Sequence, residues 1–254
     1  MSCKNLQFST ATCFPITLGA LICLTLSGCA TMMADSANTE GVKRYQSRQY
    51  DMALSSFHDA AYINPDDPDS YYNLGMTYQK IAEQTGSEAD FSRAEQNYDY
   101  CLMLAPNHPA CFRGKAVMLA NRGRTEEAQR LLADWTKDAP HLAAPVVELA
   151  RLKYELGDTT GAEEHLHKAL QKEPKNAVAL AALGRIREDA GDSNGALENY
   201  ERSYLANRNQ PGLRLRIASL RSSVRGGTPG SPTRGIDAPT GTRVVNEPTP
   251  ATIR

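Results

Sequence analysis

The sequence predicts an all-α fold, a solenoid of about five helix–turn–helix repeats closed by one further helix. A triplet made of alanine, a ring or leucine four residues later and a third residue three positions beyond occurs five times. The alanines are 41, 34, 34 and 34 residues apart, and a proline ends four of the units. Spacings of four and three place side chains on one helix face, and self-similarity at this period is typical of stacked helical repeats. The triplets are Ala53–Phe57–Ala60, Ala94–Tyr98–Cys101, Ala128–Leu132–Trp135, Ala162–Leu166–Ala169 and Ala196–Tyr200–Ser203, and the prolines are Pro65, Pro106, Pro140 and Pro174.

Each triplet is preceded by a second helical stretch, clearest at residues 71–78. There Gly75 stands where two helices touch, and a larger side chain would push the helices apart. The pattern of aromatic, Leu-Gly, Tyr, Ala, aromatic, small and Pro residues resembles the tetratricopeptide repeat, over roughly residues 34 to 210. The resemblance implies a right-handed superhelix that holds other molecules. It is carried by Tyr71, Tyr72, Asn73, Leu74, Gly75 and Tyr78 in the second unit, Leu149, Ala150, Ala162 and Leu166 in the fourth, and Leu180, Leu183, Gly184, Ala196 and Tyr200 in the fifth.

Two units depart from this pattern. In the third, Trp135 occupies the last small position and Ala116 stands where glycine is usual, so we expect adjusted packing there. The second is seven residues longer than the others, and the excess falls between its two helices around Gln84 to Asp90. An insertion there leaves the stacking of repeats intact. It is interpreted either as a tolerated loop or as a lobe that contacts a partner.

The segment after the fifth unit predicts a capping helix from Pro211 to Val224. Three apolar residues recur at helical spacing, and three arginines lie off that stripe. A solenoid needs a terminal helix with one polar face to cover its last apolar surface. The apolar residues are Leu213, Ile217 and Leu220, and the arginines are Arg214, Arg216 and Arg221.

The N-terminus predicts an exported, lipid-anchored chain. Lys4 precedes an apolar run, Ile16 to Leu26, that is too short to span a bilayer comfortably. The run ends in Leu26–Ser27–Gly28–Cys29, which resembles the bacterial lipoprotein box, in which the cysteine thiol is diacylated and the preceding peptide is removed. The alternatives are an ordinary secretory signal with a chance cysteine, or a membrane anchor that stays. Ala30 follows the cysteine, and this resembles lipoproteins that are sent on to the outer membrane of diderm bacteria, facing the periplasm.

We therefore divide the chain into a signal peptide (1–28), a lipidated cysteine and tether (29–36), a solenoid with its cap (37–224) and a tail (225–254). The tail is rich in Gly, Pro and Thr and is expected to be disordered. From Arg221 onward the net charge is +3, whereas the repeats and tether carry −5. This balance argues against nucleic acid as a partner, because nucleic acid requires a concentrated basic face.

Two cysteines remain after the lipidated one. Cys101 and Cys111 lie five residues either side of Pro106, so they face one another if the two helices are antiparallel. A disulfide is plausible in an oxidising periplasm, and two buried thiols are the alternative. None of the five histidines stands in an acid–base or metal-ligand arrangement, and no phosphate-binding glycine loop or nucleophile elbow is present. We expect no enzymatic activity, no metal, no cofactor and no small-molecule substrate.

The tetratricopeptide resemblance implies a concave groove lined by the first helix of each repeat, where Asn73 matches an asparagine that often holds a ligand backbone. Arg113, Arg151 and Arg185 form a basic row that suits a partner segment with apolar anchors and carboxylates; pairing with Glu148, Glu155 and Glu188 is the alternative. The groove residues are Val42, Tyr45, Tyr72, Asn73, Met76, Lys80, Arg113, Val117, Val147, Arg151, Tyr154 and Arg185.

These features together predict an outer-membrane adaptor that binds an unidentified envelope protein. In layout the chain is similar to lipoproteins that assist secretin assembly and to those that bring cell-wall hydrolases to their regulators. A structural link to the cell wall through the basic tail and a non-lipidated secreted peptide-binding protein are the alternatives.

Overall fold

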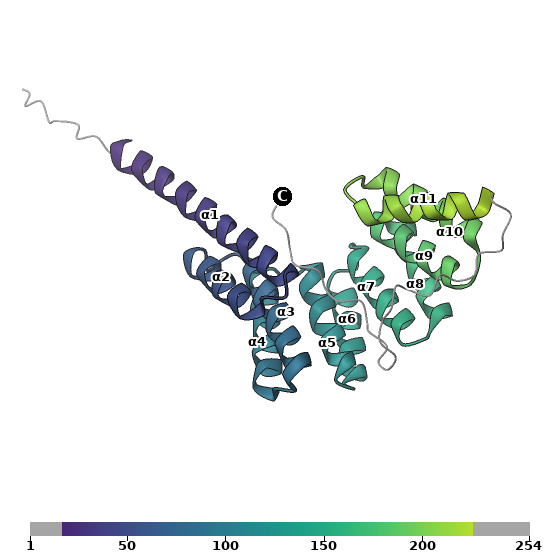
Figure 1. Ribbon diagram of the computed structural model, residues 1–254, viewed down its shortest axis with the longest axis horizontal. Helices are drawn as coiled ribbons and strands as arrows, with labels where there is room; N and C mark the ends of the chain where they lie inside the picture. The colour runs from purple at the N-terminus through teal and green to yellow at the C-terminus, as the bar shows by residue number, and fades with distance from the viewer. Residues whose placement is uncertain (1–16, 226–254) are drawn as a thin grey trace, which may run out of the picture. The chain divides into compact units, whose positions relative to one another are not determined.

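The computed structural model describes the backbone of residues 17–225, which form eleven α-helices and no strand (Figure 1). Side chains are described from 32 to 224, except at Pro211. Residues 1–16 of the expected signal peptide and residues 226–254 of the expected tail lie outside the described residues. The described chain divides into two compact units, the first ending at Asp66 and the second beginning at Asp67, and each is taken by itself.

The first unit is a helical hairpin of α1 (Thr17–Gln46) and α2 (Tyr50–Ile63). Its triplet Ala53–Phe57–Ala60 is fully buried. The Phe57 ring lies so close to Gly41 that a Cβ at that glycine would approach the ring to 2.5 Å. Residues 29–36, the expected tether, belong to α1, so the backbone from Cys29 to the first hairpin is helical. Within residues 17–225, no helix combines the length and apolar character needed to cross a bilayer.

The second unit contains four further hairpins and a final helix (Figure 1). In each hairpin the two helices pack against each other, and the first helices also contact one another in succession from α3 through α5 and α7 to α9. This succession places their inner faces on one continuous surface. The helices are α3 (Pro68–Thr85), α4 (Glu88–Leu104), α5 (Pro109–Asn121), α6 (Thr125–Asp138), α7 (Ala144–Glu155), α8 (Thr159–Lys172), α9 (Ala177–Asp189), α10 (Ser193–Ala206) and α11 (Pro211–Arg225).

The four repeat prolines end four helices. Helices α2, α4, α6 and α8 each end two residues before a proline. The pre-proline residue has ψ between 60 and 87° in every case, outside the helical region. The proline ring clashes with a helical residue before it, and this clash sets the boundary. The pre-proline residues are Asn64, Ala105, Ala139 and Glu173.

The five triplets form the core, as their spacing predicted. All fifteen side chains are buried, and within the second unit apolar clusters join α5 and α6 to α7, α7 and α8 to α9, and α10 to α11. Where the middle residue is a ring, it packs on a glycine of the first helix: a Cβ at Gly75 would lie 2.9 Å from Tyr98, and a Cβ at Gly184 would lie 2.6 Å from Tyr200. The all-α repeat solenoid predicted from the sequence is therefore confirmed.

The third repeat adjusts its packing, as its unusual residues predicted. Trp135, in the position of the small residue, stacks on Phe112 with ring centroids 4.0 Å apart and planes at 6°. Its indole Nε1 donates a hydrogen bond to Asn107 Oδ1 at 2.9 Å. The larger side chain thus fills the space between α5 and α6 and satisfies its polar atom in the preceding turn.

The seven extra residues of the second unit are helical rather than a loop. Helices α3 and α4 are 18 and 17 residues long and meet in a two-residue turn. Gly86 takes the left-handed conformation there, with φ of 74°, and the Ser87 side chain accepts a hydrogen bond from the Asp90 N–H. The extension is held from the α5–α6 turn, where the Arg122 guanidinium lies 4.1 Å from the centroid of the Phe91 ring. The insertion is therefore an ordered lengthening of one hairpin.

Helix α11 covers the last hairpin in the way expected of a cap. Ile217 and Leu220 are buried against Ala196 and Tyr200 of α10, and Leu213 packs at the edge of this cluster. The three predicted off-stripe arginines, Arg214, Arg216 and Arg221, are exposed. Two of them pair with preceding helices: Arg216 with Glu188 at 2.8 Å and Arg221 with Glu201 at 2.7 Å.

Candidate binding groove

The inner faces of α3, α5, α7 and α9 carry ten of the twelve residues expected to bind a partner, and the other two, Val42 and Tyr45, belong to α1 of the first unit. Half of the ten are buried in the groove wall rather than open to a ligand. The buried residues are Tyr72, Asn73, Met76, Val117 and Val147, and the accessible ones are Lys80, Arg113, Arg151, Tyr154 and Arg185. Tyr45 and Val42 are buried within the first unit. The surface open to a partner is therefore the charged part of the predicted set together with Tyr154.

Two arginines share one carboxylate at the centre of this surface. Arg113 Nη1 and Arg151 Nη1 lie 3.9 and 3.7 Å from Glu148 Oε1, and both distances exceed that of a hydrogen bond. Glu148 is only 6% exposed. Its second oxygen, Oε2, and the Arg113 Nε have no hydrogen-bond partner among the described residues. This trio carries a net charge of +1 and leaves polar atoms in the groove wall unsatisfied.

Arg185 is paired more fully. Its Nη1 lies 3.3 Å from Glu155 Oε1, its Nε lies 3.8 Å from Asp189 Oδ2, and its guanidinium lies 5.5 Å from the centroid of the Tyr154 ring. The Tyr154 hydroxyl donates a hydrogen bond to Asp189. Burial of the phenol and this bond to a carboxylate raise the pKa of Tyr154 to about 12.

The alternative, in which the basic row pairs with neighbouring glutamates, holds for two of the three glutamates. Glu148 and Glu155 lie within the row, as that alternative expects. Glu188 does not, because it accepts hydrogen bonds from the Tyr200 hydroxyl at 3.0 Å and from Arg216 Nε at 2.8 Å. Arg151 makes no hydrogen bond to any described residue, and its ion pair is the one with Glu148 at 3.7 Å.

The electrostatic setting of Arg151 disfavours its charge. Burial in the groove wall lowers the pKa of the Arg151 guanidinium, and the positive charges of Arg113 and Arg185 act in the same direction, whereas Glu148 opposes them. The side chain is still 28% exposed, so it can be reached from the groove. An additional anion at this point would relieve the repulsion between the arginines and supply the hydrogen bonds that Arg151 lacks.

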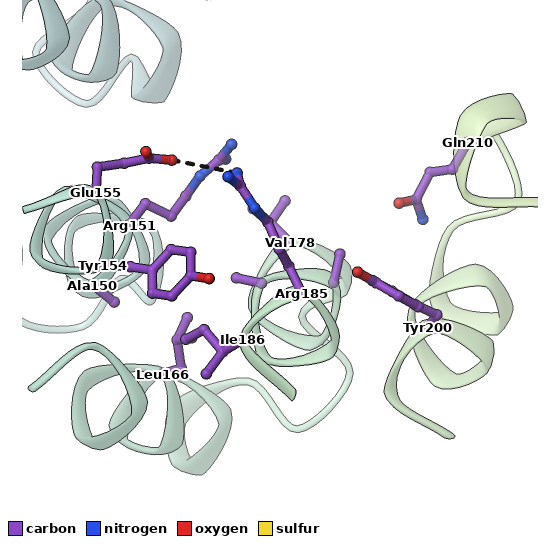
Figure 2. A pocket seen from close by; sticks show the side chains of 12 residues that line it. Ala150, Arg151, Tyr154, Glu155, Leu166, Val178, Arg185, Ile186, Tyr200 and Gln210 are labelled. Carbon is purple, nitrogen blue, oxygen red and sulfur yellow. Dashed lines mark hydrogen bonds and ion pairs between the residues drawn. The ribbon is translucent and has the colours of Figure 1, made fainter. Parts of the chain in front are cut away.

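A mostly apolar pocket of about 330 Å³ opens beside Arg151 (Figure 2). The charged ends of Arg151, Glu155 and Arg185 gather along one side of it, and Leu166 and Ile186 lie on the opposite side. A smaller hollow of about 20 Å³ adjoins it, and Arg151 and Glu155 line both. The pocket is lined by Ala150, Arg151, Tyr154, Glu155, Leu166, Val178, Ala181, Ala182, Arg185, Ile186, Tyr200 and Gln210.

The sequence interpretation included three of these twelve residues as groove residues. Val178 and Ala182 could have been found, because they precede Arg185 by seven and three residues and therefore share its helix face. Leu166 and Tyr200 belong to the core triplets, whose spacing predicts packing and gives no sign of a pocket wall. Gln210 lies before α11 and donates hydrogen bonds to the Ser203 and Asn207 carbonyls, which is a role that no repeat pattern predicts.

A second cluster lies at the corner between α4 and α5. The Cα atoms of Cys101 and Cys111 are 6.4 Å apart, and the structure joins the two sulfur atoms in a disulfide. The imidazole of His108 caps α5, since its Nδ1 accepts the Cys111 N–H, and its Nε2 contacts Asp69 Oδ1 at 2.9 Å. The ligand atoms of Cys101, His108 and Cys111 lie within 4.8 Å of one another. In this geometry both sulfurs and both ring nitrogens already have partners, so the cluster ties two repeats together.

Comparisons with known proteins agree with this fold. Residues 147–213 match the sequence model of a tetratricopeptide repeat family. A thermophilic TPR protein of Thermus thermophilus superposes with a TM-score of 0.53 at 24% identity, covering 74% of this chain and 98% of that one. A tetratricopeptide repeat protein of Parabacteroides merdae gives a TM-score of 0.54 at 16% identity, covering 73% and 70%.

Among curated proteins, 147 residues are 25% identical to Protein O-mannosyl-transferase TMTC3 of Mus musculus. The match covers 55% of this chain and 16% of the mouse protein, so the activity in that name belongs to a far longer protein. The buried triplets, the proline-ended hairpins and the structural likeness agree that the described repeats have the fold of a tetratricopeptide repeat solenoid, and the family match itself covers residues 147–213.

Proposed function

We propose that this protein is a lipid-anchored adaptor of the outer membrane, which faces the periplasm and holds a segment of another envelope protein in the groove of α3, α5, α7 and α9. In this role it assists the assembly of an envelope machine or recruits a cell-wall enzyme. Repeat solenoids bind partners along such surfaces, which are rigid and therefore lose little entropy on binding.

The observation that carries the binding role is the loose pairing in the groove. Arg113 and Arg151 share one carboxylate at 3.9 and 3.7 Å, and buried atoms beside them lack hydrogen bonds. Other ion pairs of the same repeats include tight ones, such as Arg124 with Glu95 and Glu127 at 2.8 and 2.7 Å, and a loose one such as Arg202 with Glu198 at 3.9 Å is exposed to solvent, whereas Glu148 is buried. Polar groups that are desolvated and incompletely paired cost stability, and a partner that completes them recovers this cost.

In-cell photo-crosslinking tests the binding role. A crosslinking residue at Lys80 or at the exposed Val178 should capture a defined partner, whereas one at Glu198 on α10 should not. Lys80 and Val178 lie on first helices, and Glu198 lies on a second helix with an exposed side chain. Silence from both groove positions in a functional, correctly localised protein would refute the adaptor role.

The lipid anchor rests on the lipoprotein-box resemblance at Leu26 to Cys29. The Cys29 side chain lies outside the described residues, although its backbone is part of α1. Replacing Cys29→Ala should release the protein from outer-membrane fractions and leave the signal peptide uncleaved by the lipoprotein peptidase. Membrane attachment that persists in this variant would contradict the anchor, and efficient secretion of a processed, lipid-free wild-type chain would favour a soluble peptide-binding protein.

A structural link to the cell wall is the second candidate, and the positive charge after Arg221 favours it. The residues concerned, 225–254, lie almost entirely outside the described residues. Deleting them should abolish cell-wall pulldown if the protein is a link. An adaptor that works through its groove should keep its partner crosslink after the same deletion.

A further inference from the structure

The pocket between α7 and α9 has the form of an anchor for a single side chain. Its floor is built from Ala150, Leu166 and Ile186, which are almost fully buried, and its open rim includes Val178, which is 47% exposed. A volume of about 330 Å³ admits one bulky side chain together with the backbone that carries it. The small residues Ala181 and Ala182 on α9 leave this space open.

The positive charge of Arg151 beside the pocket favours a ligand that carries a carboxylate next to its apolar side chain. Arg151 lines both the pocket and the adjoining hollow, and its guanidinium makes no hydrogen bond to a described residue. Glu155, on the same rim, is already paired with Arg185 at 3.3 Å (Figure 2). A carboxylate that enters the groove next to a seated apolar side chain would meet Arg151 and could form two parallel hydrogen bonds with it.

We infer that this pocket recognises an internal segment of the partner in which a bulky aliphatic or aromatic residue stands close to a glutamate or aspartate. The apolar side chain fills the pocket against Leu166 and Ile186, and the carboxylate binds Arg151. This inference rests on the proposed adaptor function, because it assigns the chemistry of the segment held in the groove. It predicts a specificity pocket at α7 and α9, while α3 and α5 bind other parts of the same segment.

The test uses the full chain and short dye-labelled peptides with both ends blocked, each carrying one Glu and one Leu or Phe at varied spacing in a Gly–Ser background. Fluorescence polarisation should show peptides with both residues binding at least about tenfold more tightly than matched peptides with Gln for Glu or Ala for the apolar residue; tenfold corresponds to about 1.4 kcal/mol. Arg151→Gln should weaken the Glu peptides by a similar factor and leave the Gln peptides unchanged. This difference separates ion pairing from a general loss of structure.

Two further variants address the apolar part of the site. Ala182→Phe should fill the pocket and weaken every apolar-anchored peptide, whatever its charge. Val178→Asp, at an exposed position that cannot disturb the core, should repel the ligand carboxylate and weaken the Glu peptides most. Arg202→Gln, which removes an exposed arginine of α10 paired with Glu198, should bind like the parent protein.

Equal affinity for Glu and Gln peptides, equal affinity of Arg151→Gln for the Glu peptides, binding only of peptides with a free C-terminus, or no binding at all would each overturn the inference. The proposed function would fail separately. If crosslinking from Lys80 captures a partner equally well in the Val178→Asp protein, the pocket assignment is wrong and the adaptor role stands.

Discussion

The repeats of this chain obey a pairing rule that can be tested by exchange. In each repeat one small residue of the first helix, here called the contact residue, faces the middle residue of the triplet on the second helix. The two are sixteen residues apart, or twenty-three in the longer second unit. Where the triplet has a ring, the contact residue is glycine; where it has leucine, the contact residue is alanine. The glycine pairs are Gly41 with Phe57, Gly75 with Tyr98 and Gly184 with Tyr200, and the alanine pairs are Ala116 with Leu132 and Ala150 with Leu166.

Gly184→Ala should destabilise the last hairpin. The new Cβ would lie 2.6 and 2.7 Å from two ring carbons of Tyr200, distances that force the ring or the helix to move. The ring has little freedom, because it is 6% exposed and its hydroxyl donates to Glu188. Overpacking of this kind costs about 1–3 kcal/mol, whereas the better helix propensity of alanine returns about 1 kcal/mol. We expect a net loss of up to about 2 kcal/mol in the free energy of unfolding.

Tyr200→Leu should also destabilise the protein, by about 2 kcal/mol, since it removes buried ring atoms and the bond to Glu188. The double variant recreates the alanine–leucine pair that α5–α6 and α7–α8 already use. Its loss should be smaller than the sum of the two single losses by about 1–2 kcal/mol, because the methyl group then meets a smaller side chain.

Denaturant unfolding followed by circular dichroism measures this coupling, with Gly212→Ala as the control. A Cβ at Gly212 meets no atom within 4 Å, so that variant should not lose stability. Additive losses to within about 0.5 kcal/mol would show that the two residues act independently. That result would refute the pairing rule, because residues that share one contact surface should be coupled. A stabilised Gly184→Ala protein would also refute it, since propensity alone would then decide the outcome.

Three other predictions concern different parts of the described chain. Reducing the Cys101–Cys111 disulfide, which closes a short loop, should lower the free energy of unfolding by about 2–3 kcal/mol, as measured by denaturant titration with and without reductant; a Cys111→Ser chain should show no reductant effect. Arg122→Gln should cost about 1 kcal/mol through the lost contact with Phe91 and should speed hydrogen exchange in the α3–α4 extension specifically. Burial raises the pKa of Tyr72 to about 12, so the folded state keeps a proton that the unfolded chain releases above its usual value of 10; stability should fall as pH rises from 10 to 12, and less steeply in Tyr72→Phe.

The architecture could be predicted from the sequence because each repeat has the same spacing of buried residues, and four repeats have a proline after their second helix. The triplet spacing identifies the buried face of a helix, and the pre-proline residue identifies its end, so the helices and the core follow from local rules. The adjusted third repeat was also accessible, since Trp135 in a small position has to alter its surroundings. These features depend on neighbours within about forty residues, and the repeat period supplies those neighbours.

The details of the groove depended on contacts between repeats, and local rules did not supply them. Register placed Tyr72, Asn73 and Met76 on the inner face, but adjacent helices bury them and leave the charged residues as the accessible part. The seven extra residues around Gln84 lengthen two helices, and the local signs of this were a glycine at the end of α3 and a serine at the start of α4, Gly86 and Ser87. The contact of Arg122 from the next hairpin with this extension had no local sign. Arg216, from the cap, removes Glu188 from the set of carboxylates that could have paired with the basic row.

The groove between α5 and α9 is the candidate site because local preference and tertiary packing disagree there. In most of the described structure local preference and tertiary packing agree: caps accept helix N–H groups, rings meet glycines, and buried polar atoms find partners. At Arg113, Glu148 and Arg151 they disagree, since two cations share one buried carboxylate without a hydrogen bond. Replacing Arg151 by an uncharged residue of similar length would remove the repulsion, so the fold alone gives no reason for its charge. Conflicts of this kind in an otherwise consistent sequence are typical of functional sites. A partner carboxylate that binds Arg151 would resolve the conflict, and for that reason an unliganded Arg151→Gln protein should be at least as stable as the parent while binding its partner less tightly.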